Sequence, residues 1–399
     1  MTSSSSQTPQ FNSDEGLAPD QVEKLRRKIA AEIDSGRMPS AQFAFARNGQ
    51  VELAESFGTA SNSTAFNIFS ATKALIAGVV WQLIGEGKLR PDTLAVELIP
   101  EFGSRGTTPE WLAQVTLEHL LTHTSGFPTA PLGPPKWDTR DGRLDVMSRW
   151  RGTFEPGTHF EYHPTAAHWV VAEMIEAVEG IDFREVVRAR ILEPLSLTDL
   201  HLGPDSAAAD VAPLVAVGDL PSAAEIAEVF GDIEFELGEV TPEILLAFND
   251  PSIRAVGVPG GGGTATASAL ATYYQALLHN TGELWDPNVL ADGTGTIRCT
   301  LPDPMSGVPA NRTLGLVRSG DDGKSSMRGM GPTVSSLAFG HNGAGGQIVW
   351  ADPETGYSFA FTTSAIERNF IREARRILSI TSRAGLCTRP GMNLEGGRV

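Results

Sequence analysis

The sequence predicts an α/β fold in which an antiparallel sheet, flanked by the N- and C-terminal helices, is interrupted by a large all-α insertion. Segments typical of strands gather near both ends of the 399-residue chain, in the order helix–hairpin at the start and hairpin–helix at the end. The middle is helix-rich and broken by loops of proline and glycine. We therefore assign 16–90 and 309–384 to an α/β domain and 91–308 to a helical domain, with a disordered segment at 1–15 and a loose tail at 385–399.

The first part of the chain predicts a helix, a hairpin and a second helix. Apolar residues recur at helical spacing over 20–33, so we expect an amphipathic helix there. Two alternating stretches, 41–47 and 50–56, are separated by an Asn-Gly dipeptide, which strongly favours a two-residue hairpin turn. From 72 to 87 apolar side chains occur on nearly every face, which indicates a buried helix.

The last part of the chain returns to strands and then to a helix. Residues 346–351 and 357–363 are typical of strands, and the turn-forming residues at 352–356 join them. A helix is expected from Glu367 to about Ser382. These elements belong to the same sheet domain as the N-terminal hairpin, which is why the helical middle is read as an insertion.

The overall composition excludes several classes of function. A formal net charge of −17 argues against nucleic acid and against anionic membrane surfaces, since both require clustered Lys and Arg. No stretch approaches the ~20 apolar residues of a membrane span, and the start of the chain lacks the features of a secretory signal, so we expect a cytoplasmic protein. Cys299 and Cys387 are far apart and match no metal or redox spacing, which favours free thiols.

The residues that carry chemistry begin with Ser70-Ala71-Thr72-Lys73. Three positions apart on a helix, the serine and lysine side chains can meet. A serine hydroxyl is a weak nucleophile until a base takes its proton, and a buried lysine with a lowered pKa can serve as that base. At the start of a helix the N–H of Ser70 would also favour a developing oxyanion. The spacing alone is more often that of a polar helix cap followed by a solvated lysine, and the context of the motif has to decide.

The context of this motif resembles the class C β-lactamases and penicillin-binding proteins. The chain matches the family pattern, in order, in the Ser70 segment, in Thr122-His123-Thr124-Ser125-Gly126, at Tyr162 and in His341-Asn342-Gly343. The blocks that carry the resemblance are 66–73, 87–89, 98–102, 115–127, 156–162, 193–195 and 340–343.

The resemblance implies how the remaining site residues act. Tyr162 would face Ser70 and Lys73 from the helical domain and shuttle the proton. His341 would be a hydrogen-bonding group beside the nucleophile, and the N–H of Ala344 would complete an oxyanion hole with that of Ser70.

Asn342 and Gly343, which lie between His341 and Ala344, complete the expected site. Gly343 would let the substrate approach the strand, and Asn342 would also contact it. A strand-end histidine without a chemical role, and a core tyrosine, are the alternatives for His341 and Tyr162.

Two departures from the family pattern bear on the substrate. Pro164 stands where the family often has an asparagine, and His341-Asn342 replace the usual Lys-Thr. Both changes remove groups that would hold the amide or carboxylate of a β-lactam. We therefore expect a serine hydrolase acting on a neutral, largely apolar ester or lactone, similar to esterases of this superfamily and in overall impression to bacterial lactonases that open zearalenone-type mycotoxins. A β-lactamase or D-Ala-D-Ala carboxypeptidase, and a non-catalytic binding protein, are the alternatives.

Neither a metal nor a cofactor is expected. His159, His163 and His168 surround Tyr162, but their spacing matches no zinc motif. The glycine-rich stretch 258–264 lacks the Gly-Lys-Ser/Thr ending of a phosphate loop, and flexibility or tight packing accounts for it. The expected partner is a small-molecule substrate, and the sequence does not predict an oligomeric state.

Overall fold

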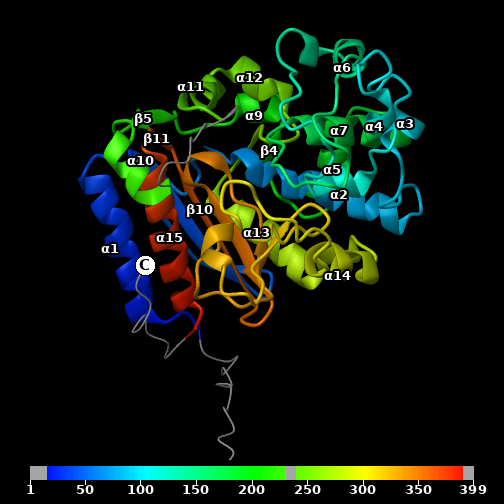
Figure 1. Cartoon of the computed structure of the whole chain (residues 1–399). Helices are drawn as coiled ribbons and strands as arrows, with labels where there is room; N and C mark the ends of the chain where they lie inside the picture. The colour runs from blue at the N-terminus through cyan, green and yellow to red at the C-terminus, as the bar shows by residue number, and fades with distance from the viewer. Residues whose placement is uncertain (1–15, 231–239, 390–399) are drawn as a thin grey trace, which may run out of the picture.

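A computed structural model describes residues 16–230 and 240–389, with the side chain of Phe230 outside the description. The predicted disordered segment 1–15 therefore lies outside the described residues, as does most of the predicted tail. Within the described part, a six-stranded antiparallel sheet, of which β10 is labelled in Figure 1, has the order β2-β1-β10-β9-β8-β7. Its strands are β1 (Ser40–Arg47), β2 (Gln50–Gly58), β7 (Val317–Arg318), β8 (Phe339–Gly340), β9 (Ile348–Asp352) and β10 (Tyr357–Thr363).

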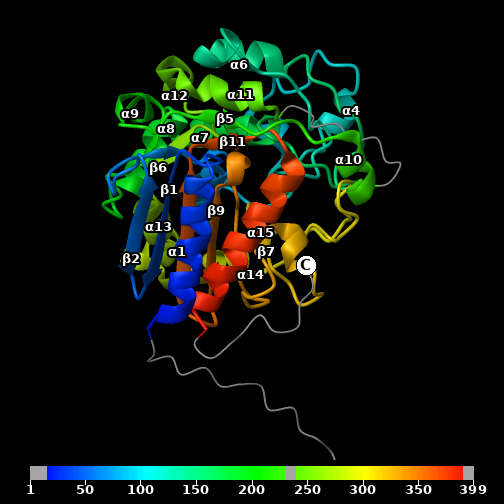
Figure 2. The ribbon, with the colours of Figure 1, turned by 90° about the vertical axis from the view of Figure 1, so that its left-hand side faces the viewer.

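The two ends of the chain cover one face of this sheet together. Figure 2 shows α1 (Pro19–Asp34) and α15 (Phe370–Cys387) side by side in front of the strands. Their apolar faces bury Leu25, Ile29 and Ile380 against Phe43 and Phe359 of the central strands. This arrangement agrees with the predicted sheet and its flanking helices.

The C-terminal tail begins later than expected. The helix α15 continues to Cys387, and residues 385–389 are buried, so the prediction of a loose tail from 385 is wrong for these five residues. The buried ending includes Arg389, whose Nη2 pairs with Asp352 at 3.0 Å. Residues 390–399 lie outside the described residues.

The opposite face of the sheet is covered by α13 (Ala267–His279), which comes from the middle of the chain. The side-chain amide of Gln275 donates to O of Ala46 at 2.9 Å and to Oγ of Ser358 at 3.1 Å, and so ties α13 to β1 and β10. The assignment of 91–308 to a separate helical domain therefore misplaces α13. The apolar pattern of α13 predicts a buried helix, but it does not indicate whether that helix packs on the sheet or in the helical region.

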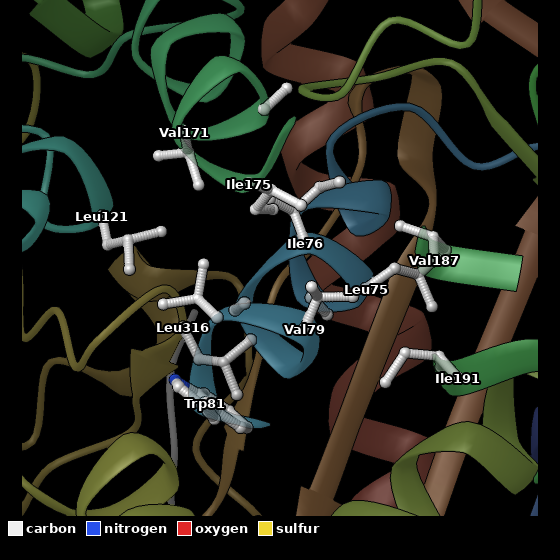
Figure 3. Packing of buried hydrophobic residues seen from close by; sticks show 14 of the residues in the cluster. Leu75, Ile76, Val79, Trp81, Leu121, Val171, Ile175, Val187, Ile191 and Leu316 are labelled. Carbon is white, nitrogen blue, oxygen red and sulfur yellow. The ribbon is translucent and has the colours of Figure 1, made fainter. Parts of the chain in front are cut away.

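The helical region is built around α2 (Lys73–Gly85), which is buried on nearly every face as its sequence predicts. Figure 3 shows Leu75, Ile76 and Val79 packed among side chains of α7 (Ala166–Glu179) and α8 (Phe183–Val187). No side chain caps the start of α2. Burying each large apolar side chain contributes about 1.5–3 kcal/mol, against about 1 kcal/mol for a cap, so packing alone fixes this helix.

Shorter elements complete the described fold. Two small sheets join β11 (Ala365–Glu367) in parallel to β5 (Val215–Val217), and join β3 (Phe66–Asn67) and β4 (Leu200–Leu202) to β6 (Gly263–Ala265). The other helices are α3 (Ala95–Leu98), α4 (Pro109–Leu112), α5 (Leu117–Leu121), α6 (Arg140–Met147), α9 (Pro204–Ala208), α10 (Ala223–Phe230), α11 (Pro242–Leu246), α12 (Pro251–Val256) and α14 (Pro287–Gly295). Short turns of helix occur at η1 (Phe69–Thr72), η2 (Lys136–Asp138), η3 (Arg188–Leu192), η4 (Ala247–Asn249), η5 (Thr281–Glu283), η6 (Ser325–Arg328) and η7 (Ala344–Gly346).

Two further expectations concern the whole chain. Cys299 and Cys387 are buried free thiols. Among the described residues, no helix combines the length and the apolar composition needed to cross a bilayer.

Candidate active site

A sharp backbone turn immediately before Ser70 sets the position of this side chain. Phe69, the first residue of η1, has a φ of 43°, a left-handed conformation that costs a non-glycine residue about 1–3 kcal/mol. Its buried ring packs edge-on against Phe248, with the ring centres 5.5 Å apart. At the other end of the turn, Thr72 Oγ1 accepts a hydrogen bond of 2.9 Å from the N–H of Gly263. The strained segment is thus held on both sides of Ser70.

Lys73 lies next to Ser70 and is completely buried, with 0% of its surface exposed. Its Nζ atom is 3.1 Å from Ser70 Oγ, 2.8 Å from O of Pro164 and 2.6 Å from O of Gly260. Burial lowers the pKa of Lys73, against the opposite influence of Tyr162. A carbonyl oxygen only accepts, so the two carbonyls engage two N–H groups, and in the neutral amine the lone pair faces Ser70 Oγ. The site therefore points this nitrogen at the proton of Ser70.

Tyr162 reaches the same oxygen from the other side. Its Oη is 2.8 Å from Ser70 Oγ, and Lys73 Nζ lies 5.1 Å from the centre of its ring. Burial alone would raise the pKa of Tyr162, but the charges of Lys73 and Arg312 and the hydrogen-bonding contacts with Ser70 and Lys73 together lower it. The structure thus brings Ser70, Lys73 and Tyr162 together as the sequence predicts. One oxygen contacts two groups that can exchange a proton.

Three buried histidines lie behind Tyr162. The ring of His123 is 4.5 Å from that of Tyr162, and the rings of His163 and His168 are each 5.9 Å from His123. The Nδ1 atom of His163 is 2.6 Å from O of Glu161 and must donate to it, since a carbonyl only accepts. Burial lowers the pKa of all three, to about 4 for His163. At neutral pH they are therefore uncharged.

His159 and the glycine-rich stretch 258–264 are not expected to take part in catalysis, and the structure shows where each lies. His159 lies in an exposed segment, where its Nδ1 is 2.8 Å from Thr158 Oγ1. In the described ranges, no group of three or more His, Cys, Asp or Glu side chains has an arrangement that could hold a metal ion. The glycine-rich stretch is tightly packed: a Cβ on Gly260 would lie 2.7 Å from O of Pro164 and 3.4 Å from Lys73 Nζ. Glycine is needed there because the loop passes too close to the carbonyl oxygen of Pro164 for a side chain to fit.

The third motif differs from its expected role. Nδ1 of His341 lies 2.9 Å from O of Asn342 and donates to it, so Nε2 accepts from Arg312 Nη1 at 3.2 Å. His341 thus bonds Arg312 in place of the nucleophile, and its ring is 6.1 Å from that of Tyr162. The side-chain amide of Asn342 donates to O of Gly329 and accepts from N–H of Val349. Both its polar atoms are engaged within the fold, so the predicted substrate contact by Asn342 is not what the structure shows.

Gly343 and Ala344 place the backbone beside Ser70. A Cβ on Gly343 would lie 2.1 Å from O of Ile68, so only glycine allows the strand end to pack against the segment that carries the nucleophile. This is a different reason for glycine from the predicted approach of the substrate, and the N–H of Gly343 is taken by O of Gln347 at 3.0 Å. Ala344 begins η7 as Phe69 begins η1, and N–H groups in a first helical turn have no acceptor within their own helix.

A cleft of about 430 Å³ opens at this site, lined by Tyr162 and Ala344. Its other lining residues are mostly apolar or acidic: Pro128, Pro164, Val240, Pro242, Leu245, Pro304, Met305, Ile366 and Phe370, with Glu161, Asp303, Glu367 and Glu373. Burial raises the pKa of Glu161, and it raises that of Glu373 to about 7. Arg368 is the one cation among the described lining residues. The cleft therefore favours uncharged or positively charged groups over anions.

Arg312 is the site residue that sequence reasoning missed. Its guanidinium carbon lies 5.3 Å from the centre of the Tyr162 ring and 5.4 Å from that of Phe160. The backbone of Arg312 pairs with that of Cys299 in an isolated antiparallel bridge. Neither residue belongs to one of the sequence motifs. One signal could have prompted a search for it: the third motif lacks the lysine usual in the family, which leaves the place of a cation open.

This fold and this arrangement of Ser, Lys and Tyr define a β-lactamase-like protein. The Beta-lactamase family model matches residues 25–381, and the chain belongs to this family.

Three individual relatives match between 75% and 93% of this chain. Esterase/beta-lactamase LipL of Mycobacterium tuberculosis is 29% identical over 318 residues, which cover 75% of this chain and 69% of LipL. A penicillin-binding protein homologue from Caulobacter crescentus is 26% identical with a TM-score of 0.73, covering 93% of this chain and 98% of that chain. A family VIII carboxylesterase, 22% identical with a TM-score of 0.72 over 93% of this chain and 99% of that chain, shares the fold.

Proposed function

We propose that this protein is a serine hydrolase that cleaves carboxylic esters of small, uncharged, largely apolar substrates through an acyl-enzyme on Ser70. The observation that carries the proposal is the double contact at Ser70 Oγ, 3.1 Å from Lys73 Nζ and 2.8 Å from Tyr162 Oη. A hydroxyl in contact with two basic groups of lowered pKa is an activated nucleophile.

The reaction follows from these contacts. The Lys73–Tyr162 pair, after losing one proton, takes the proton of Ser70 as Oγ bonds to the ester carbonyl carbon. The negative charge passes to the carbonyl oxygen, where the N–H groups of Ser70 and Ala344 would stabilise it. The carbon–oxygen bond to the alcohol then breaks, and the pair returns its proton to the leaving oxygen. Water repeats the sequence on the acyl-enzyme and releases the carboxylic acid and free Ser70.

The cleft supports an uncharged substrate. Its carboxyl groups, Glu161 and Glu373 among them, disfavour a substrate carboxylate, and its apolar residues favour hydrocarbon groups. The description of LipL as an esterase/beta-lactamase supports ester hydrolysis in this branch of the family. Within the proposal, a lactone is an ester whose alcohol stays attached to the acyl group, so a macrocyclic lactone of the zearalenone kind is one substrate to test.

The experiment compares a nitrophenyl ester, an apolar lactone and a chromogenic cephalosporin. We expect kcat/KM for the better of the first two to exceed that for the cephalosporin by at least ~10²-fold. Ser70→Ala should abolish turnover, by at least ~10⁴-fold, with unchanged circular dichroism, because only the nucleophilic oxygen is lost. Ser268→Ala on α13, outside the cleft lining, is the matched control and should retain activity. Comparable efficiency on the cephalosporin would refute the ester preference, and turnover by Ser70→Ala would refute the mechanism.

A further inference from the structure

A second cation lies against the catalytic tyrosine without a carboxylate partner. The guanidinium of Arg312 sits between the rings of Tyr162 and Phe160, at 5.3 and 5.4 Å from their centres. Its Nη1 donates to His341 Nε2 at 3.2 Å, and its Nε is buried without a hydrogen bond. Within the described part of the chain, no carboxylate forms an ion pair with it. Arg312 therefore keeps an uncompensated positive charge beside Tyr162.

Arg312 carries the fixed positive charge of this site, because the titratable groups around it are neutral or more distant. The surrounding histidines, at 123, 163, 168 and 341, are neutral because burial lowers the pKa of each. Two further groups act on Arg312: Cys299, whose pKa burial raises, and Asp303, which acts on it through its charge without a hydrogen bond or ion pair among the described residues. With both Lys73 and Tyr162 protonated the cluster carries two positive charges, and after the loss of one proton it carries one.

We propose that Arg312 supplies the fixed cation that the third motif lacks, and that it is a positioning residue acting through Tyr162 to make the Ser70–Lys73–Tyr162 site ready to accept a proton near neutral pH. His341 then has a defined task, which is to hold Arg312 in place by accepting its Nη1–H. The inference rests on the proposed function, since it concerns the proton that the hydrolysis uses. It goes beyond it by assigning the source of the electrostatic bias.

The geometry favours this role over direct contact with the substrate. Arg312 is not among the described residues that line the cleft, whereas Tyr162 is. The faces of two aromatic rings enclose the guanidinium, and the ring of His341 occupies its Nη1. A cation at this distance repels the extra proton of the Lys73–Tyr162 pair, an influence that lowers the pKa of both residues. Removing the charge should therefore make the pair hold its proton to higher pH.

The test is the pH dependence of kcat/KM for a neutral nitrophenyl ester. For Arg312→Gln we expect the midpoint of the rising limb to move to higher pH by about 1 to 2 units, with activity largely recovered above it. Arg312→Lys keeps the charge on a shorter group and should shift the midpoint by less than half as much. The matched control is Arg318→Gln on β7, a partly buried arginine whose side chain donates to O of Gly295 and to O of Ser336, and it should leave the midpoint unchanged.

Two outcomes would overturn the inference. One is an unmoved midpoint in Arg312→Gln. The other is a loss confined to KM for an ester bearing a carboxylate, which would make Arg312 a substrate contact. If Arg312→Gln does not fold, as judged by thermal unfolding, the smaller shift expected for Arg312→Lys is the deciding measurement.

The rate at which a fluorophosphonate labels Ser70 separates this inference from the proposed function. Labelling that rises with pH, with the same midpoint in Arg312→Gln as in the unaltered protein, would refute the role of Arg312 alone. Failure of Ser70 to be labelled at any pH would refute the proposed function.

Discussion

The two walls of the active site contribute to it in different ways. The helical wall, made of Ser70, Lys73 and Tyr162, supplies side chains whose reactive atoms lie within 3.1 Å of one another along a single chain of contacts. The strand wall, made of His341, Gly343 and Ala344, supplies a backbone position and holds a remote cation. The side chains of the helical wall carry protons, whereas the strand wall shapes the space and the field in which the protons move. Substitutions on the two walls should therefore differ in size and in kind.

The largest effect is expected on the helical wall. Lys73→Ala and Tyr162→Phe should each lower kcat by at least ~10²-fold, the scale of general-base catalysis. The double variant should lose much less than the product of the two, since both groups act on one proton. Stopped-flow or steady-state turnover of a nitrophenyl ester measures this. The control is Lys88→Ala, an exposed lysine paired with Glu179, which should be kinetically silent; full additivity would contradict the shared proton.

A smaller loss is expected when the strand wall is displaced. In Gly343→Ala the new Cβ would meet O of Ile68 at 2.1 Å, so the strand end and Ala344 must shift relative to Ser70. Misplacement of this order lowers kcat by ~10- to 10²-fold, with a smaller change in KM. Gly133→Ala, where a Cβ would meet nothing within 4 Å, is the control. An unchanged kcat in Gly343→Ala would show that the Ala344 backbone does not take part.

The remaining prediction concerns stability and not turnover, and it sharpens the contrast because the neutral histidines lie behind the helical wall. The pKa of His163 is about 4 in the folded protein, against an ordinary 6.5. Between these values the unfolded chain binds the proton and the folded one does not, so the free energy of unfolding falls as pH decreases from 6.5 to 4. His163 alone contributes on the order of 3 kcal/mol over this window. Urea unfolding at pH 7, 6 and 5 measures the slope, and a flat profile would contradict a buried neutral His163.

Much of this architecture can be predicted because its signals are local. The Asn-Gly turn at 48–49 fixes the first hairpin, and the all-round apolar pattern after Thr72 indicates the buried helix. The Ser70–Lys73 spacing predicts the first two catalytic residues. Their partner Tyr162 could be assigned only from the resemblance to a family. Each of these depends on residues that are neighbours in sequence or stand in a recognised order.

The rest depends on contacts made only in the folded chain. Arg312 meets His341 because two distant segments pair, and no local pattern around it distinguishes it from a surface arginine. The side-chain amide of Asn342 is hydrogen-bonded to the backbone of Gly329 and Val349. No sequence pattern links these three residues. The packing of α13 on the sheet likewise depends on contacts with β1 and β10, which are distant from it in sequence. Tertiary partners decide these features, and the sequence alone does not display them.

The way Lys73 is held bears on how the substrate range of such an enzyme can change over evolutionary time. One of its acceptors is the main-chain oxygen of Pro164, which any amino acid at that position would also provide. The side chain at 164 lines the cleft and can vary without removing that oxygen. A Pro164→Asn change would thus introduce an amide toward the substrate while keeping the lysine in place. Position 260 has no such latitude, because any side chain there would collide with O of Pro164. Selection for new substrates is therefore expected to act at 164 and to leave 260 unaltered.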